Sequence, residues 1–368
     1  MELKRNSPLA FGIAVALITV AILFVMSAKA QVRSDFAKGN DSGDLAKKAA
    51  ILQKAPELSG ISGYINAPDG FRLSDAKGKV ILVDFWTYSC INCIRTLPYL
   101  TAWDEMYRDK GLVIIGVETP EFEFEKDRDN VQKAVRKFGI RYPVVQDNDY
   151  ATWTAYGNRY WPHKYLIDSD GFIRYDHIGE GGYEETEQEI RKLLSERDNK
   201  TGMGSLVSGN VSSPRVDFTR LGTPEIYLGS GFARAPLGNP EGFSAGQVVS
   251  YALPPSVEPN LVYLEGSWKN NEDNMELVSD SGKIVLNFQA KNLNIVCGGD
   301  STLGLKLDGS VPQPSQLGPD AGISDGSALA HTGDLRLYSL IDKADYSPQT
   351  LTIEVHGKGF RIYTFTFG

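Results

Sequence analysis

The stretch Val80–Pro98 reads VILVDFWTYSCINCIRTLP and joins an apolar run to a Cys-x-x-Cys pair. Its first residues are apolar with high β-propensity, which predicts a buried strand that continues to Trp86. Cys90 and Cys93 follow a three-residue break, at the start of a segment typical of a helix. At this spacing the two sulfurs meet in the first helical turn, where unpaired N–H groups and the helix dipole stabilise a thiolate. The pattern predicts a redox dithiol in which Cys90 attacks, Cys93 resolves and a Cys90–Cys93 disulfide is the oxidised form.

A cysteine pair can also serve as a structural disulfide or as part of a zinc site. A structural disulfide across two intervening residues would close almost no loop and would stabilise little. A zinc site would need a second pair of Cys or His at ligand spacing. The chain has three Cys and four His and contains no such second pair. We therefore expect neither a metal nor another cofactor.

Together, Val83–Trp86, the dithiol and Pro98 resemble a thioredoxin-fold active site. The segments WTYSCINCIRTLPYL, GVETPEFEFEK and YWPHKYLIDSDG, within residues 80–171, resemble the extracytoplasmic part of the DipZ-type thiol–disulfide proteins, relatives of the TlpA group. This resemblance implies a thioredoxin fold, protein disulfides as substrates and a membrane electron donor of the CcdA or DsbD type. We expect that donor to be a separate protein.

Asp84 is the candidate proton acceptor. It lies six residues before Cys90, inside the apolar strand, where an isolated carboxylate is costly and its pKa should rise. The same spacing in thioredoxins implies that this Asp takes the proton of the resolving Cys93. The alternative is an Asp at a solvated sheet edge.

Pro162 is the candidate proline of a substrate groove. In the thioredoxin fold a cis-proline before the corresponding strand faces the dithiol, whereas the alternative is an ordinary trans proline. We expect Trp86, Trp161 and His163 to line the same groove. His163 could tune the pKa of Cys90, although a lone His is more often structural.

The loop Thr119–Glu125 follows a second buried strand, at the end where α/β sites tend to lie. It either contacts a partner or uses its Glu residues to stabilise the N-terminus of the next helix. The sequence favours neither interpretation.

The N-terminal 30 residues are interpreted as a signal anchor or signal peptide. Lys4 and Arg5 precede an apolar run, Leu9–Met26, that is long enough to span a bilayer. Ala28-Lys29-Ala30 offers a cleavage pattern, but the run is longer than a usual signal-peptide core, so an uncleaved anchor is favoured. Cleavage after Ala30 would give a secreted protein. Either way we expect the body to lie outside the cytoplasm.

The remaining chain divides by composition into a polar tether at 31–55, a thioredoxin-like domain at 56–200, a Gly/Ser-containing linker at 201–222 and a second domain at 223–368. Short alternating runs separated by Gly, Pro, Asn and Asp predict a β-sandwich, jelly-roll-like, for the last part. Its opening TPEIYLG and closing YTFTFG resemble the carbohydrate-binding-module-like domain of DipZ-type proteins. Trp268 could then form a stacking platform for a glycan, or it could be core. Cys297 is predicted to be an inert buried thiol.

The sequence as a whole predicts a membrane-tethered extracytoplasmic thiol–disulfide oxidoreductase. The net charge of −8 argues against nucleic acid as a partner. Neither Ile91 nor Asn92 adds a cation beside Cys90, which favours a reductase over a strong oxidant. The alternatives are an oxidase or isomerase with the same site, a thiol peroxidase, and a glycan- or partner-binding protein with an auxiliary redox domain. Peroxidases of this fold use Pro-x-x-x-Thr-x-x-Cys, and Val83 stands here in place of the Pro.

Overall fold

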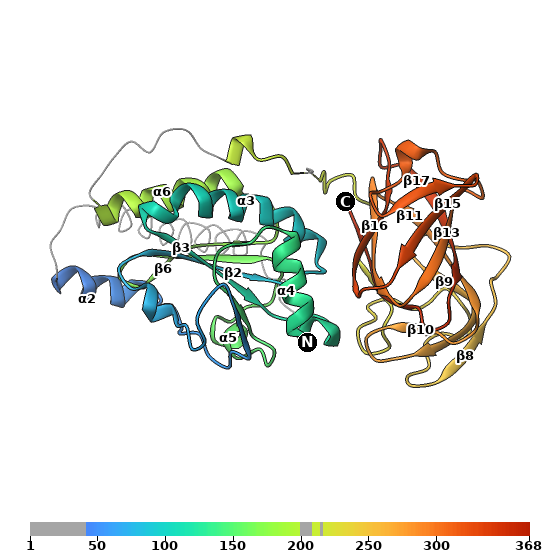
Figure 1. The fold of residues 1–368 in the computed structure, drawn as a ribbon, viewed down its shortest axis with the longest axis horizontal. Coiled ribbons are helices and arrows are strands. Elements are labelled where there is room, and N and C mark those ends of the chain that lie inside the picture. The colour runs from blue at the N-terminus through green and yellow to red at the C-terminus, as the bar shows by residue number, and fades with distance from the viewer. Residues whose placement is uncertain (1–41, 199–207, 214–215) are drawn as a thin grey trace, which may run out of the picture.

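The computed structural model describes residues 42–198, 208–213 and 216–368. These residues form an α/β domain and an all-β domain, which lie beside each other (Figure 1). The predicted signal anchor, Leu9–Met26, falls outside the described residues. Within the described ranges, no helix combines the length and the apolar character needed to cross a bilayer.

The first domain is built on a mixed six-stranded sheet with the strand order β1-β4-β3-β2-β5-β6. Its central strand, β2, runs parallel to β3 and antiparallel to β5. The predicted apolar run thus occupies the middle of the sheet, as expected for a segment buried on both faces. The strands are β1 Gly63–Ile65, β2 Val80–Trp86, β3 Leu112–Glu118, β4 Val144–Gln146, β5 His163–Ile167 and β6 Ile173–Ile178.

Helices α3 and α6 cover one face of this sheet, where Leu100 and Leu194 pack in one apolar cluster with Leu82 of β2. The other face packs in a separate cluster around Phe85 and Tyr156. This arrangement is the thioredoxin fold that the sequence resemblance implied. The helices are α2 Ser42–Ile51, α3 Ile91–Tyr107, α4 Arg128–Lys137, α5 Ala151–Ala155 and α6 Tyr183–Asp198, with 3₁₀ turns at Leu73–Ala76, Arg108–Lys110 and Glu123–Lys126.

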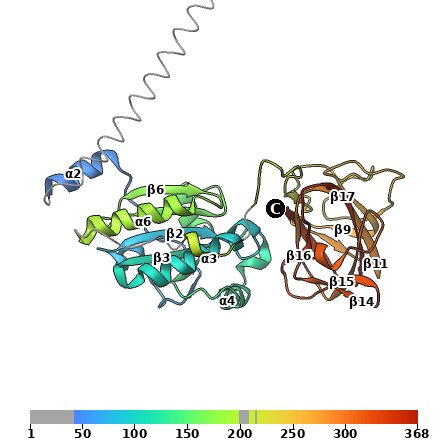
Figure 2. The same ribbon diagram turned by 90° about the horizontal axis from the view of Figure 1, so that it is seen from above.

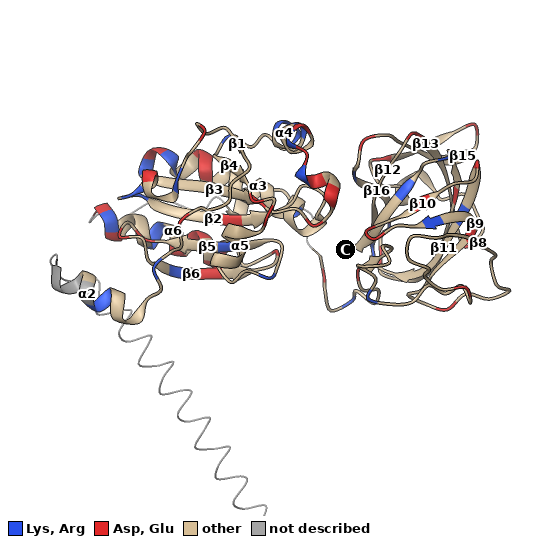
Figure 3. Ribbon diagram, turned by 90° about the horizontal axis from the view of Figure 1, so that it is seen from below, with Lys and Arg blue, Asp and Glu red and all other residues tan. Residues whose placement is uncertain are grey.

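The second domain is an all-β structure whose two sheets are joined through β9 and β10, so that its strands form one continuous path. Its core is apolar and lies between the two sheets. The strands are β7 Ile226–Tyr227, β8 Val248–Tyr251, β9 Val262–Asn270, β10 Met275–Leu277, β11 Ser281–Gln289, β12 Asn292–Gly298, β13 Ser301–Leu307, β14 Ala321–Ser324, β15 Ser327–Thr332, β16 Arg336–Asp342, β17 Pro348–His356 and β18 Arg361–Phe367, with a 3₁₀ turn at Pro314–Gln316. A further 3₁₀ turn, Ser208–Asn210, precedes this domain and contacts α6 of the first domain through Ser208, whose backbone N–H donates to Glu187. Charged residues are frequent on the first domain, whereas the strands of the second are mostly uncharged (Figure 3).

Trp268 belongs to the core of this second domain. Its side chain is 0% exposed and its ring meets that of Phe360 edge-on at 6.4 Å. The hypothesis of a stacking platform on Trp268 is therefore wrong, because the indole has no face toward solvent. Cys297 is likewise buried in β12, and burial raises the pKa of its thiol, as expected for an inert cysteine.

The two domains meet through the sheet formed by β12, β16 and β18. Figures 1 and 2 place β16 on the side of the second domain that faces the first. The contact is an apolar group, here called the interdomain cluster, to which both domains contribute. Its members are Ile91, Ile94, Phe122, Phe124, Tyr227, Phe232, Val296, Leu335, Leu337 and Tyr363. Since Ile91 lies between the two cysteines, the second domain reaches the edge of the dithiol.

Candidate active site

The dithiol occupies the N-terminus of α3. Cys90 is the N-cap residue, and its sulfur accepts a hydrogen bond from the backbone N–H of Cys93 at 3.3 Å. Cys90 is partly exposed, whereas Cys93 is 1% exposed. The Cys90 sulfur can therefore contact another molecule while the Cys93 sulfur stays buried. Among the residues that the structure describes, no group of three or more His, Cys, Asp and Glu side chains could hold a metal ion.

Asp84 lies beneath this dithiol. Side chains alternate along β2, so Asp84 shares a face with Leu82 and Trp86, which pack in the same apolar cluster as Cys93. Burial raises the pKa of Asp84 to about 7. Burial also raises the pKa of Cys93 well above its usual range, and the nearby Cys90 and Asp84 act in the same direction. The Cys93 thiol and the Asp84 carboxyl group are therefore both buried, and the charge of Asp84 acts on the thiol.

Lys164 is a site residue that the sequence analysis missed. β5 pairs with β2 in a register that places Lys164 opposite Asp84, and its side chain is 1% exposed. The Lys164 ammonium donates to the backbone oxygen of Gly179 at 3.0 Å. Burial lowers the pKa of Lys164 to about 8, although the charges of Asp84, Cys93 and Glu180 act to raise that pKa. In turn, the charge of Lys164 counteracts the burial of Asp84 and lowers its pKa.

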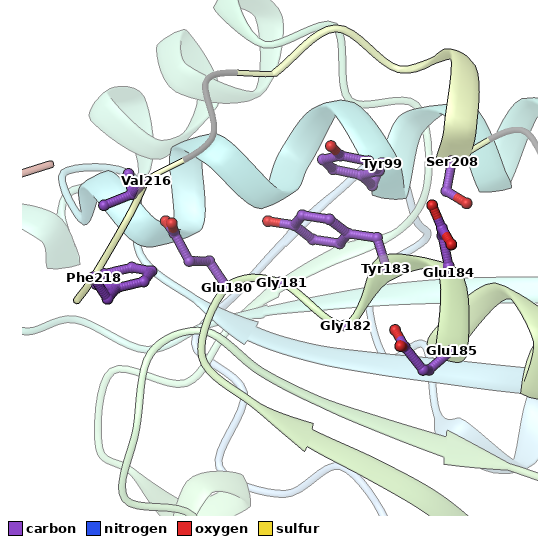
Figure 4. Close-up of a pocket in the computed structure, with 10 residues that line it drawn as sticks. All are labelled: Tyr99, Glu180, Gly181, Gly182, Tyr183, Glu184, Glu185, Ser208, Val216 and Phe218. Carbon is purple, nitrogen blue, oxygen red and sulfur yellow. The ribbon is translucent and has the colours of Figure 1, made fainter. Parts of the chain in front are cut away.

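A buried ion pair lies near Lys164, and the charge of its acidic member, Glu180, acts against the burial that lowers the pKa of Lys164. Arg95 of α3 is 6% exposed, and its guanidinium stands 3.4 Å from the carboxylate of Glu180. Glu180 also lines a pocket of about 380 Å³ with Tyr99 and Tyr183, whose rings stack at 3.5 Å (Figure 4). Neither Cys90, Cys93 nor the two residues between them line this pocket, so we assign it no part in thiol chemistry.

Two buried carboxyl groups support the loop that leads to Cys90. The Thr87 hydroxyl donates to Glu118 at 3.3 Å, and the Ser89 hydroxyl donates to Glu125 at 2.5 Å. The other oxygen of Glu125 accepts from the backbone N–H groups of Glu121 and Phe122, at 2.6 and 3.0 Å. Burial raises the pKa of both carboxyl groups. Glu125 therefore ties the residue before Cys90 to the loop that follows β3.

This loop, Thr119–Glu125, contacts the second domain of the same chain. The Tyr227 hydroxyl lies 2.6 Å from a carboxylate oxygen of Glu121, and the rings of Phe122 and Tyr363 are 5.1 Å apart. The N-cap of α4 is Asp127, which accepts from a backbone N–H in the first turn. Both interpretations of the loop have support, because it contacts the second domain of the same chain and the Glu125 carboxylate accepts from the N-cap N–H of the 3₁₀ turn Glu123–Lys126.

Pro162 stands at the same edge of the sheet as the dithiol loop. His163 opens β5 opposite Phe85, so the preceding proline falls level with the end of β2, where the loop to Cys90 begins. The Trp161–Pro162 peptide bond is cis. Trp161 is partly exposed, and its indole N–H donates to the backbone oxygen of Thr119 at 3.0 Å.

Two residues expected in the groove are placed elsewhere. Trp86 is 0% exposed, and its indole lies over Gly116, where a Cβ would approach the indole nitrogen to 2.9 Å. His163 shares the opposite sheet face with Phe85, where its ring nitrogens meet Asn158 at 2.6 Å and Asp176 at 3.0 Å. Burial lowers the pKa of His163. The expectation that either residue lines the groove is wrong, because one is core and the other faces away from the dithiol.

Comparison with known proteins gives two family matches and several related sequences. Residues 223–368 match the family described as thioredoxin like C-terminal domain, and residues 51–176 match the AhpC/TSA family. The chain is 35% identical to protein DipZ of Mycobacterium tuberculosis over 92% of this chain and 46% of that protein. It therefore spans about half the length of the DipZ proteins it matches.

Shorter relatives match a smaller part of the chain. The thiol-disulfide oxidoreductase YkuV of Bacillus subtilis is 27% identical over 40% of this chain and 99% of its own length. The thiol-disulfide oxidoreductase ResA of Bacillus thuringiensis is 31% identical over 33% of this chain and 67% of its own length.

Proposed function

Because this chain belongs to the thioredoxin-like thiol–disulfide oxidoreductases, we propose that it reduces protein disulfides outside the cytoplasm. One observation carries the assignment of roles: Cys90 is partly exposed at a helix N-terminus, while Cys93 is buried beside Asp84. An exposed thiolate can meet a protein disulfide, and a buried thiol with a nearby base can act only after that meeting.

The reaction has two displacement steps. The Cys90 thiolate attacks one sulfur of the substrate disulfide, forms a mixed disulfide and releases the other substrate sulfur as a thiolate, which takes a proton from solvent. Cys93 then loses its proton to the carboxylate of Asp84, which is ionised above a pH of about 7. The Cys93 thiolate attacks the Cys90 sulfur and expels the second substrate thiolate. Two electrons pass to the substrate, and the protein is left with a Cys90–Cys93 disulfide.

Continued turnover requires re-reduction of that disulfide. We infer that a membrane electron donor of the CcdA or DsbD type supplies the electrons, and that the N-terminal segment holds the chain at the extracytoplasmic face of the membrane. The sequence similarity to DipZ and the apolar run Leu9–Met26 support this placement.

The direction of electron flow is tested by the reduction potential of the dithiol. The full chain, kept in detergent because of its apolar N-terminal run, is equilibrated with thiol buffers, and the oxidised fraction is measured by alkylation. A potential near the thioredoxin value of about −270 mV supports a reductase, whereas one near about −120 mV supports an oxidase. A reductase should also reduce insulin disulfides in the presence of a small thiol, and Cys90→Ser should abolish that activity.

Thiol peroxidation is a second candidate, because residues 51–176 match the AhpC/TSA family. Thr87 is present three residues before Cys90, but its hydroxyl donates to the buried Glu118. Consumption of hydrogen peroxide by the reduced protein, at a rate comparable to insulin reduction, would favour the peroxidase.

A further inference from the structure

The outward face of the β12–β16–β18 sheet has an apolar half and a polar half. Val296 and Leu337 belong to the apolar half, which packs against Ile91 and Ile94 of α3 in the interdomain cluster. Residues further along the same strands present amide, hydroxyl and carboxylate groups instead. These residues are Asn292, Asn294, Ser339 and Asp342. The first domain covers the apolar half, and within the polar half Asn294 is also buried and donates its amide to the backbone oxygen of Thr366.

A cleft of about 590 Å³ separates this polar half from α3. Its α3 wall is mainly apolar and runs from Ile91, the residue after Cys90, to Thr101, with Leu97 and Pro98 between them. At a rise of about 1.5 Å per residue, that wall is roughly 15 Å long. The cleft therefore starts at the dithiol and leads away from it along the helix.

We propose that this interdomain cleft binds an extended polypeptide segment that flanks the disulfide of the substrate; the proposal rests on the function proposed above. A length of roughly 15 Å accommodates four to five residues of extended chain at about 3.3 Å each. Side chains of such a chain point alternately to opposite sides. Apolar side chains can then lie on α3, while polar groups meet Ser339 and the half-buried Asn292.

The charged residues that line the cleft determine which polypeptide segments fit it best. Arg95 lines the cleft but is already paired with Glu180. Asp342 is exposed, and it accepts a hydrogen bond at 2.7 Å from the side chain of Asn292, which is a neutral donor. The contact leaves the negative charge of Asp342 uncompensated, so a segment that carries Lys or Arg fits better than an acidic one.

The first experiment narrows the cleft in the full chain. Ser339→Trp places an indole on the polar wall, and Ser324→Trp is the matched control, because Ser324 is an exposed serine of β14 that does not line the cleft. The substrates are oxidised glutathione and an eight-residue peptide of alternating Leu and Lys, linked to glutathione through one Cys.

For Ser339→Trp, the ratio of kcat/KM for the peptide to kcat/KM for oxidised glutathione should fall about tenfold, which corresponds to about 1.4 kcal/mol. Ser324→Trp should leave that ratio unchanged. An unchanged ratio in Ser339→Trp would overturn the proposal, as would an equal fall in both variants.

The second experiment tests charge and does not depend on Ser339. Wild type should prefer the Leu/Lys peptide to an otherwise identical Leu/Glu peptide, and Asp342→Asn should reduce that preference severalfold. Equal use of the two peptides by wild type would overturn the assignment of a cation-bearing segment. If wild type reduces neither oxidised glutathione nor any peptide, the proposed function itself is wrong. That result differs from the results above, in which the protein reduces disulfides but the cleft does not bind the peptide.

Discussion

Cys93 and Cys297 are both fully buried thiols, one in each domain, and the comparison between them shows what makes a cysteine reactive. Burial raises the pKa of both. Cys93 lies near the Cys90 sulfur, the Asp84 carboxyl group and the Lys164 ammonium, whereas Cys297 is packed in the apolar core of the second domain. Burial alone keeps a thiol protonated and inert. A buried thiol becomes useful when a second sulfur and a proton acceptor are buried with it.

The largest effect is expected from removing the resolving thiol. Cys93→Ser should stop turnover and leave the substrate attached to Cys90 as a mixed disulfide, because Ser cannot displace the bound sulfur. Non-reducing gels and mass spectrometry would detect the adduct. The double variant Cys90→Ser/Cys93→Ser is the control and should trap nothing. Sustained turnover by Cys93→Ser would show that the two cysteines have been given the wrong roles.

Removing the proton acceptor should have the next largest effect. Asp84→Asn should slow resolution of the mixed disulfide by about 10²-fold, the usual contribution of a general base. The initial attack by Cys90 needs only its own thiolate and should change much less. Stopped-flow measurement with a fluorescent mixed disulfide separates the two steps. Equal slowing of both would mean that Asp84 acts on the whole site and not on Cys93.

Removing the buried cation should shift the pH dependence. The rate of resolution should rise with pH as Asp84 ionises, with a midpoint near its pKa of about 7. Because Lys164 lowers that pKa, Lys164→Met should move the midpoint upward, by about one pH unit on the usual scale for an adjacent charge. Lys133→Met, at an exposed lysine of α4, is the matched control. A midpoint that stays at its wild-type value would show that Lys164 does not affect the proton transfer from Cys93 to Asp84.

Changing the other buried thiol should have the smallest effect on activity. Cys297→Ala should leave insulin reduction unchanged while it lowers the free energy of unfolding by about 1 kcal/mol, because it removes a buried sulfur from a packed core. Chemical denaturation and the insulin assay measure the two quantities. A loss of activity at unchanged stability would show that Cys297 contributes to the reaction and is not inert.

Local patterns in the sequence predicted the dithiol, Asp84 and the strand and helix around them. Each of these depends on residues close together in the chain, such as the apolar run that ends at Trp86. Lys164 was missed because its partnership with Asp84 depends on the pairing register of β2 and β5. A Lys in an otherwise apolar strand was the available signal, since such a residue is rarely buried without a partner.

The sheet faces on which Trp86, His163 and Trp268 lie could not be predicted from the sequence, for a related reason. Residue type alone does not tell which face of a sheet a side chain occupies, and a shift of one residue reverses that face. In the second domain the runs that match β9, β11, β12, β13, β16, β17 and β18 were predicted, whereas β7, β8, β10, β14 and β15 were not. Apart from β15, the missed strands have two to four residues, which are too few side chains to show an alternation.

The position of β18 within the second domain has a consequence for biosynthesis. This strand lies between β10 and β12 and also pairs with β7, so the wall beside Ile91 is incomplete until β18 has been added. Domains fold as they emerge, N-terminal first, and the dithiol domain is synthesised well before β18. A nascent chain would therefore pass through a stage in which Cys90 is already presented but one side of its surroundings is still open. During that interval the dithiol should react with a wider range of disulfides than the finished protein accepts.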